Sequence, residues 1–210
     1  MRLGKGLRKW RKKVRFNILY VDPPWQYEQN RLSGVAEKHY RTLTDEEIYR
    51  LPVGDIAADN CILFLWVTGP KLPEALTAIK SWGFDYRTVG FVWAKQNRKS
   101  PTWFFGLGFW TRGSTEACLL AVKGKPRRIS ASVSQLVVSP LEEHSKKPDI
   151  VRDRIVELIG DLPRAELFAR RKYQGWICVG DEVDGMDIRD SIARLKEMQE
   201  EEDGREPCTS

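Results

Sequence analysis

The stretch that decides the fold is FNILYVDPPW, residues 16–25, in which an apolar run ends at Asp22-Pro23-Pro24-Trp25. Five of the six side chains in residues 16–21 are apolar or aromatic, which is typical of a strand buried on both faces of a parallel sheet. The strand has to end at Asp22, because each proline lacks an N–H and fixes φ, and Pro24 also holds Pro23 in extended geometry. We expect a rigid turn whose carbonyls are left free to accept hydrogen bonds.

The residues of this turn suit a flat molecule that carries an amino group. In open α/β sheets, ligands bind at the carboxyl ends of the strands. Asp22 and the Pro23 carbonyl could accept the two amino hydrogens of a purine or pyrimidine, while Trp25 or another aromatic side chain stacks on the ring. Taken alone, the tetrapeptide is equally compatible with a buried strand that ends in a Pro-Pro turn and leaves Asp22 solvated.

The composition indicates one soluble domain. The chain has 210 residues and a mass of 24.3 kDa, enough to bury a single core. It has no apolar run near the ~18 residues of a membrane span, and no apolar segment follows the basic amino terminus, so we expect an intracellular, cytoplasmic protein. Cys61, Cys118 and Cys178 lie in apolar runs, and the sequence has no CxxC pair or Cys/His cluster. We therefore expect no metal site and no disulfide framework.

Positive charge is concentrated in an amino-terminal arm. The net charge is +6, but residues 1–15 hold eight Lys or Arg and no acid, so the rest of the chain has slightly more acids than bases. Such an arm indicates contact with a polyanion, most often nucleic acid. The alternative is a tail that folds back on the acidic residues 197–206. The chain is thus divided into the arm (1–15), a domain (16–185) and a charged tail, partly helical and then disordered (186–210).

Strand and helix patterns alternate through the domain. Residues 61–67 form a second continuous apolar run, and residues 72–82 have the 3.6-residue period of an amphipathic helix that Gly83 ends. Thr44 and Glu47 form a capping box at the start of another helix. The remaining predictions are strands at 86–94, 116–122, 166–169 and 176–179, helices at 148–159 and 188–198, and a polar irregular segment at 125–139.

Two long connections hold candidate substrate residues. Residues 26–41 are polar and end in His39 and Tyr40, just before the capped helix; a lone histidine is more often structural, and we treat His39 so. Residues 96–114 mix Lys, Arg and Gly with large aromatics such as Trp103 and Trp110. This composition suits stacking on bases and pairing with phosphates. It is equally compatible with a hydrophobic flap that packs down.

Seven blocks in order relate the chain to a known family. They are Asp22 to Trp25, HYRTLTDEEI (39–48), LFLWVTGPKLPEAL (63–76), GLGFWTR (106–112), HSKKPD (144–149), ELFAR (166–170) and GWICVGDEV (175–183). Together they resemble the DPPW class of S-adenosylmethionine-dependent adenine N(6)-methyltransferases. That family includes the catalytic subunit of the eukaryotic messenger-RNA adenosine methyltransferase together with bacterial and phage relatives.

The resemblance implies an α/β, Rossmann-like methyltransferase fold: a mostly parallel sheet with helices on both faces, and a catalytic half that precedes the cofactor half. It also implies a set of site residues. The catalytic turn is Asp22, Pro23, Pro24 and Trp25. The residues expected to bind S-adenosyl-L-methionine are Asp22, Lys147, Phe168, Arg170, Lys172, Tyr173, Asp181 and Glu182. The residues expected to bind the substrate are Tyr40, Lys95, Trp110, Arg112 and Glu116.

Several roles follow from the same resemblance. Arg170 and Asp181 would hold the ribose hydroxyls, Lys147 the methionine carboxylate, and Asp22 the methionine ammonium as well as the base. One departure concerns Asp181, which stands where relatives commonly have Asn, so this side chain keeps an acceptor and loses a donor. In addition, no residue upstream of the DPPW strand matches a cofactor-adenine contact found in some relatives.

The expected function is methyl transfer from S-adenosyl-L-methionine to the exocyclic amino group of adenine in DNA. DNA is favoured because the chain is short and shows no accessory RNA-binding domain. Three alternatives stay open: RNA adenosine N(6)-methylation, cytosine N(4)-methylation, and a non-catalytic partner subunit that binds nucleic acid. The sequence does not say whether the protein acts alone or in a homo- or hetero-oligomer.

Overall fold

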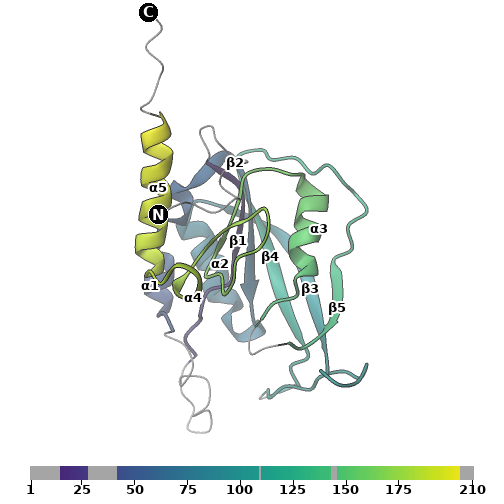
Figure 1. The fold of residues 1–210 in the computed structure, drawn as a ribbon. Coiled ribbons are helices and arrows are strands. Elements are labelled where there is room, and N and C mark those ends of the chain that lie inside the picture. Colours follow the sequence, from purple (N-terminus) through teal and green to yellow (C-terminus); the bar gives the residue numbers. More distant parts are fainter. Residues whose placement is uncertain (1–14, 28–41, 109, 143–145, 204–210) are drawn as a thin grey trace, which may run out of the picture.

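The computed structural model describes residues 15–27, 42–108, 110–142 and 146–203 (Figure 1). Its strands are β1 (Phe16–Val21), β2 (Ala57–Val67), β3 (Asp85–Gln96), β4 (Thr115–Lys123), β5 (Leu136–Pro140), β6 (Arg164–Leu167) and β7 (Ile177–Val179). Its helices are α1 (Asp45–Tyr49), α2 (Leu72–Ser81), α3 (Ile150–Ile159), α4 (Asp181–Asp184) and α5 (Ile188–Asp203), with short 3-10 turns η2 (Val53–Asp55) and η3 (Gly69–Lys71). No helix in these described ranges is long and apolar enough to cross a membrane.

The strands form one seven-stranded sheet in the order β5-β3-β4-β2-β1-β6-β7. β1 runs parallel to β2 and β6, β6 runs parallel to β7, and β3 runs parallel to β5. β4 is antiparallel to both of its neighbours, β2 and β3. The α/β fold with a mostly parallel sheet is therefore confirmed.

Helices cover both faces of the sheet, as the alternation along β1 requires. Leu19 and Val21 point into a core shared with α1, α2 and α5, whereas Ile18 and Tyr20 point into a core shared with α3. Figure 1 shows this division, with α3 alone on one side of the sheet. Because β1 is buried on both faces, it carries the near-continuous apolar run that the sequence shows.

Helix boundaries follow local chemistry. Thr44 caps α1 through a complete capping box: its hydroxyl accepts from the Glu47 N–H, and the Glu47 carboxylate accepts from the Thr44 N–H at 2.9 Å. Gly83, two residues beyond α2, has φ +79°, a conformation in which a glycine is favoured. Both predictions are confirmed.

Three sequence predictions about packing were wrong. Residues 125–139 were expected to be irregular, yet β5 begins at Leu136 and pairs with the edge of β3. Leu72 and Leu76 were expected on the buried face of α2, but they are largely exposed, and Ala75, Ala78 and Ile79 are buried instead. On α3, Ile150 is exposed, and Arg152 is buried beside Val151 and Ile155.

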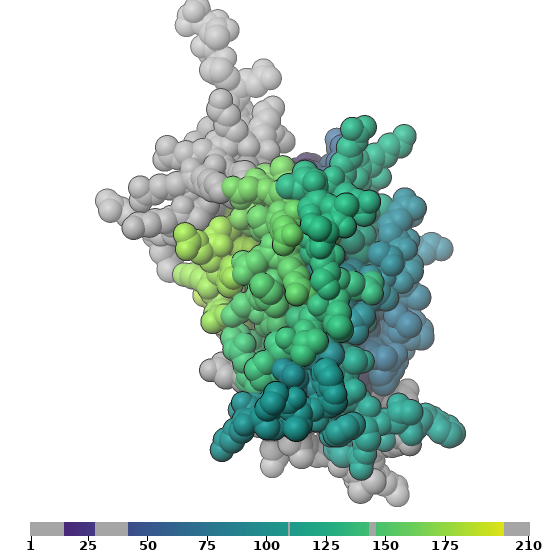
Figure 2. Space-filling model, turned by 90° about the vertical axis from the view of Figure 1, so that its right-hand side faces the viewer, coloured from purple at the N-terminus to yellow at the C-terminus, as the bar shows by residue number. Residues whose placement is uncertain are grey.

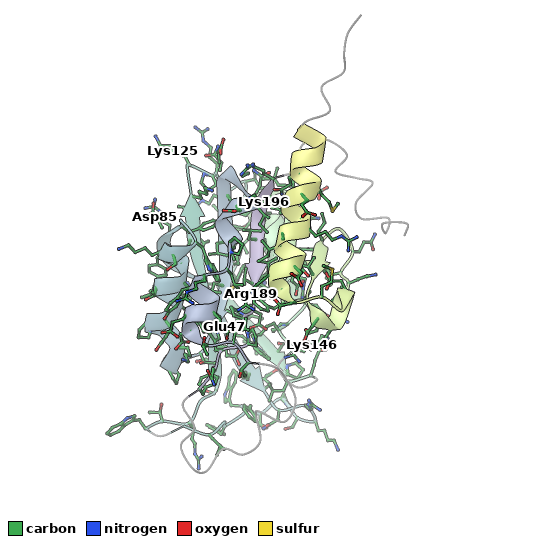
Figure 3. All side chains as sticks on the ribbon, turned by 90° about the vertical axis from the view of Figure 1, so that its left-hand side faces the viewer. Glu47, Asp85, Lys125, Lys146, Arg189 and Lys196 are labelled. Carbon is green, nitrogen blue, oxygen red and sulfur yellow. The ribbon has the colours of Figure 1, made fainter. Side chains whose placement is uncertain are left out.

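The carboxyl-terminal helix packs on the domain. Ile188, Ile192 and Leu195 of α5 belong to the core that α1 and α2 share. The Arg189 guanidinium lies 3.0 Å from the Glu47 carboxylate, and Figure 3 shows the two side chains side by side. The part of the expected tail that forms α5 is therefore an integral element of the domain.

The basic arm lies outside the described residues, apart from Arg15. The Arg15 guanidinium donates to the Asp55 carbonyl at 3.2 Å.

The strand directions bring many chain segments to one edge of the sheet. Because β4 is antiparallel, its first residues lie at the same edge as the last residues of β1, β2, β3, β6 and β7. Asp22 follows β1 at this edge, Lys95 is the penultimate residue of β3, and Glu116 is the second residue of β4. The residues after β6 and β7 complete the edge.

Candidate active site

The turn after β1 is fixed by hydrogen bonds of its own carbonyls. The Pro23 carbonyl accepts from the Trp25 N–H at 2.9 Å, and the Pro24 carbonyl accepts from the Leu43 N–H at 3.1 Å. The expectation that both carbonyls stay free was therefore wrong. A carbonyl oxygen has two lone pairs, so Pro23 can still accept a second hydrogen bond, and its direction is set by the first.

Trp25 is a core residue. Its side chain is 6% exposed, and its indole N–H donates to the Trp66 carbonyl at 3.1 Å. Buried in this way, it anchors the turn to β2 and does not present a free ring face at the edge. The stacking role that the sequence offered to Trp25 or another aromatic therefore has to come from another side chain.

Four charged side chains alternate in sign beside the turn. The Lys147 ammonium lies 2.9 Å from the Asp22 carboxylate and 3.3 Å from the Glu116 carboxylate, and Glu116 also pairs with Lys95. The two lysines lie against indole rings, Lys147 at 5.6 Å from the centre of Trp66 and Lys95 at 5.1 Å from that of Trp93. We call Asp22, Lys147, Glu116 and Lys95 the edge ion group.

The edge ion group is partly buried, and this shapes the protonation of its members. Burial raises the pKa of Asp22, and Lys147 offsets part of that rise. Burial disfavours charge on Lys147, but Asp22 and Glu116 outweigh it and raise the Lys147 pKa. Burial likewise opposes charge on Glu116, but Lys147 and Lys95 outweigh it and lower the Glu116 pKa. Asp22 is thus the carboxylate of the group with the greater affinity for a proton.

The expected cofactor residues after β6 and β7 lie close together. Phe168 has φ +60°, and Gly180 packs so tightly that a Cβ there would come within 2.8 Å of the Ala169 carbonyl oxygen. Arg170 Nε lies 3.8 Å from the Glu182 carboxylate. The Asp181 carboxylate accepts from the Glu182 N–H at 2.9 Å. Arg170 also acts on Asp22, whose pKa it lowers after the larger effects of burial and Lys147, so the two halves of the edge share one electrostatic environment.

Lys172 and Tyr173 have different surroundings. Lys172 is exposed. The Tyr173 hydroxyl donates to the Asp153 carboxylate at 3.1 Å, and the Arg152 guanidinium lies 5.1 Å from the Tyr173 ring centre. Tyr173 is therefore held against α3, and its expected contact with a cofactor stays a prediction.

Of the residues expected to bind the substrate, Trp110 and Arg112 have exposed side chains. Trp110 is 99% exposed and Arg112 is also exposed, both on the connection between β3 and β4. Figure 2 shows this teal connection at the lower end of the face that carries α3. Phe105 and Leu107 are exposed on the same segment, so the alternative of a flap that packs down is wrong for these side chains. Tyr40 and His39 lie outside the described residues.

Two residues at this edge were missed from the sequence. Trp66, the penultimate residue of β2, holds Trp25 through its carbonyl and lies under Lys147; its indole N–H donates to the Tyr20 hydroxyl at 2.6 Å. Tyr27 bonds to Thr68 across the edge. Their positions in the sequence could have indicated both residues. Trp66 lies near the end of the apolar run of β2, the strand beside β1, and Tyr27 follows the DPPW turn by two residues.

Comparison with known proteins identifies the family. A family model described as MT-A70 matches residues 16–182. The chain belongs to the MT-A70 family. The match covers every expected site residue after the arm, and the recognition made from the seven sequence blocks is confirmed.

Individual relatives agree with this membership. The Type II methyltransferase M.MunI of Mycoplasma sp is 35% identical over 189 residues, which cover 80% of this chain and 78% of that protein. The N(6)-adenosine-methyltransferase catalytic subunit METTL3 of Homo sapiens is 31% identical over 189 residues, covering 87% of this chain. The chain spans only 31% of the length of that human protein. As a member of the MT-A70 family, the protein is a methyltransferase of the adenine N(6) class.

Proposed function

We propose that this MT-A70 protein transfers a methyl group from S-adenosyl-L-methionine to the exocyclic amino group of adenine in DNA. The observation that carries the proposal is Asp22, a carboxylate fixed at the carboxyl end of a central strand and paired with Lys147 at 2.9 Å. DNA is favoured as the acceptor by the 35% identity to the Type II methyltransferase M.MunI over 80% of this chain.

The turn can activate a poor nucleophile. The lone pair of an adenine amino group is delocalised into the ring, so the nitrogen has to become pyramidal before it attacks. Asp22 and the Pro23 carbonyl would each accept one N–H, which localises the lone pair on nitrogen. As the nitrogen–carbon bond forms, positive charge grows on nitrogen, and two fixed acceptors stabilise it with little reorganisation.

The proton has a defined acceptor. As the methyl group is transferred, the carbon–sulfur bond breaks and its electron pair goes to sulfur. The methylated amino nitrogen is then positively charged and has to lose one proton. Burial raises the pKa of Asp22, so this carboxylate holds a proton more readily than an exposed aspartate does. Asp22 would take the proton and pass it to solvent, because part of its side chain is exposed.

The residues at the edge fit the chemistry of the cofactor. S-adenosyl-L-methionine carries an ammonium, a carboxylate and two ribose hydroxyls, and when bound it supplies the methyl group as a sulfonium electrophile. Asp22, Asp181 and Glu182 are acceptors for the ammonium and the hydroxyls, and Lys147 and Arg170 are cations for the carboxylate and ribose. Lys147 already bonds Asp22 and Glu116, so it would share or exchange these partners when it holds a carboxylate.

Several groups of residues would bind the nucleic acid. A base in a duplex has to be flipped out, at a cost of a few kcal/mol. The exposed aromatics and Arg112 between β3 and β4, together with the basic arm of residues 1–15 and Tyr40, would offset that cost through stacking and phosphate contacts. Lys95 and Glu116 would line the base side of the edge. A cytoplasmic location is part of the proposal.

RNA is the second candidate acceptor. It is favoured by the 31% identity to the human N(6)-adenosine-methyltransferase subunit, which extends over 87% of this chain. The same turn could also serve cytosine, which presents an amino group of its own.

One experiment decides among these acceptors. The full chain is incubated with methyl-labelled S-adenosyl-L-methionine and either unmethylated genomic DNA or total RNA, and the nucleosides are analysed by mass spectrometry. We expect labelled N(6)-methyldeoxyadenosine, and about 10²–10³-fold less of it with the Asp22→Ala variant. Label only in RNA adenosine or only in cytosine would replace the proposal with that alternative. No methylated nucleoside, together with no binding of the cofactor, would leave a non-catalytic partner subunit.

A further inference from the structure

The edge needs an aromatic face that Trp25 does not provide. Trp25 is 6% exposed and committed to the Trp66 carbonyl. A planar base held by Asp22 and Pro23 would still gain from a ring stacked against it, because every base has an apolar face. The side chain that offers this face has to be exposed, aromatic and fixed near Asp22.

Tyr27 has these properties. Its side chain is 44% exposed, and its hydroxyl lies 2.6 Å from the Thr68 hydroxyl. Thr68 directly follows β2, the strand beside β1, so the hydrogen bond draws the tyrosine across the carboxyl ends of the two strands. The ring is thereby held at the edge where Asp22 lies.

One face of the Tyr27 ring is already covered. The Lys71 ammonium lies over it, 6.0 Å from the ring centre, and is itself held by two hydrogen bonds to the Asp45 carboxylate at 2.8 and 2.9 Å. Lys71 is buried, so this arrangement fixes the ring from behind as well as through its hydroxyl. The exposed part of the ring is then available to a ligand.

The charges of the edge ion group act on the phenol of Tyr27. Burial raises the pKa of Tyr27, the hydrogen bond to Thr68 partly offsets the rise, and smaller effects come from Glu116, Lys147 and Asp22. The other strongly exposed aromatics of the described residues lie on other segments. Trp103, Phe105 and Trp110 lie on the β3–β4 connection, and Tyr86 lies at the far end of β3.

We propose that Tyr27 is a substrate-binding residue whose ring stacks on the target base while Asp22 and Pro23 receive its amino group. This inference rests on the proposed function, because it requires a planar amino-bearing base as substrate. The bond to Thr68 fixes the angle of the ring. Stacking has little dependence on the sequence around the base, so Tyr27 contributes affinity and positioning and no choice of recognition site.

The test separates the ring from the hydroxyl. Tyr27→Leu removes the ring, Tyr27→Phe keeps the ring and removes the hydroxyl, and Tyr86→Leu is the matched control, because Tyr86 is 43% exposed at the opposite end of the sheet. The full chain is assayed for kcat/KM with unmethylated genomic DNA. Binding is compared for two single-stranded oligonucleotides that differ only in having adenines or abasic sites.

We expect Tyr27→Leu to lower kcat/KM about tenfold or more and to remove most of the binding preference for the adenine oligonucleotide. Tyr27→Phe should stay within about threefold of the wild type, because the ring is kept. Tyr86→Leu should match the wild type. A Tyr27→Leu variant with unchanged kcat/KM and preference would overturn the inference while leaving the proposed function intact. A Tyr27→Phe variant as impaired as Tyr27→Leu would overturn it too, since the hydroxyl and not the ring would then matter.

A second measurement uses the wild-type protein and does not depend on how the variants fold. A single-stranded oligonucleotide containing 8-azidoadenine is photo-crosslinked to the full chain, and the adduct is mapped by mass spectrometry. We expect the label on Tyr27. Label confined to residues 96–114 would overturn the inference. If the wild type methylates no acceptor at all, the proposed function fails, and the position of the cross-link still decides the role of Tyr27.

Discussion

Two of the buried or partly buried ion-pair systems among the described residues differ in how accessible they are to a ligand. In the edge ion group, Lys147 divides its charge between Asp22 and Glu116, and the Asp22 side chain is 24% exposed. Beneath α3, Arg152 makes two hydrogen bonds to Glu166, one of them at 2.7 Å, and the two side chains are 8% and 6% exposed. Asp22 in the first system can exchange partners with a ligand, whereas the Arg152–Glu166 pair is sealed, and of the carboxylate partners of Arg152 among the described residues only Asp149 is partly exposed.

The rings around the two systems reinforce the difference. Arg152 lies 5.2 Å from the Tyr20 ring centre and 5.1 Å from that of Tyr173, so its guanidinium is enclosed between two aromatic side chains. The Lys147 ammonium lies beside the Trp66 indole and between two carboxylates, of which Asp22 is 24% exposed. We therefore expect substitutions in the Arg152–Glu166 pair to lower the free energy of unfolding. Substitutions in the edge ion group should instead lower the rate of methyl transfer.

The largest expected effect is on folding. Arg152→Met leaves Glu166 buried without its partner and should lower the free energy of unfolding by about 3–5 kcal/mol. The double variant Arg152→Met/Glu166→Leu should be less destabilised than Arg152→Met. Denaturant unfolding measures both, with the exposed Arg189→Met as control. A loss in Arg152→Met no greater than in the control would show that the pair is not a sealed one.

This loss should depend on pH. Burial raises the pKa of Glu166, and Arg152 offsets part of that rise, so removing Arg152 raises it further. A carboxyl whose pKa is raised in the folded protein binds more protons folded than unfolded, and stability then falls as the pH rises through that range. Arg152→Met should therefore be less stable at neutral pH than at mildly acidic pH, relative to wild type.

The next largest effect is on catalysis. Asp22→Ala should reduce methyl transfer by about 10²–10³-fold, because it removes a fixed acceptor of the amino group. Its melting temperature should change little, since the side chain is partly exposed at a strand end and Lys147 keeps Glu116 as a partner. Asp59→Ala, an exposed carboxylate near the opposite end of β2, is the control. Activity of Asp22→Ala within tenfold of the wild type would show that Asp22 is not the acceptor of the amino group.

The activity should depend on pH in the opposite direction to the stability of Arg152→Met, because kcat/KM should fall as the pH is lowered. Asp22 can take the amino proton only as a carboxylate, so kcat/KM should fall about tenfold per pH unit once the pH drops below its raised pKa. Lys147 lowers the Asp22 pKa against the larger effect of burial. In Lys147→Ala the acidic inflection should therefore move to higher pH. An inflection at the same or a lower pH would mean that another group controls the profile.

The smallest effect is expected at the far end of the edge ion group. Lys95 pairs with Glu116, and Glu116 is connected to Asp22 through Lys147. Lys95→Met should lower kcat/KM by about fivefold, the value of one modest hydrogen bond. Steady-state kinetics beside Asp22→Ala provide the comparison. Equal losses in the two variants would mean that the group acts as a unit and not in graded steps.

The sequence predicted the elements that carry a strong local pattern. β1 has the predicted bounds, and the Thr44 capping box and the Gly83 helix end are in place. β5 was missed because it is an edge strand in which Val137 is the one fully buried side chain, so its pattern is weak. α5 was predicted as a helix at 188–198 within a tail, and its packing on the domain was missed because its many charged residues mask Ile188, Ile192 and Leu195 at helical spacing.

The sequence named residues that the structure brings together, but it did not predict the contacts between them. Asp22 and Lys147 were both expected from sequence blocks, but their ion pair joins positions 125 residues apart, and no local pattern encodes it. Trp25 looked like the stacking ring because it adjoins the prolines. Its burial depends on the Trp66 carbonyl of a neighbouring strand, which only the sheet order reveals.

The place of β1 in the sheet has a consequence for synthesis. β1 is made first but pairs with β6, which ends at Leu167. At translation rates of about 5–20 residues per second, Lys147 follows Asp22 after roughly 6–25 seconds, and β6 is complete only after roughly 7–29 seconds. During that time the nascent chain exposes an apolar strand edge, the kind of surface that aggregates. Slowing elongation late in the message should therefore lower the soluble yield, and chaperones that shield strand edges should restore it.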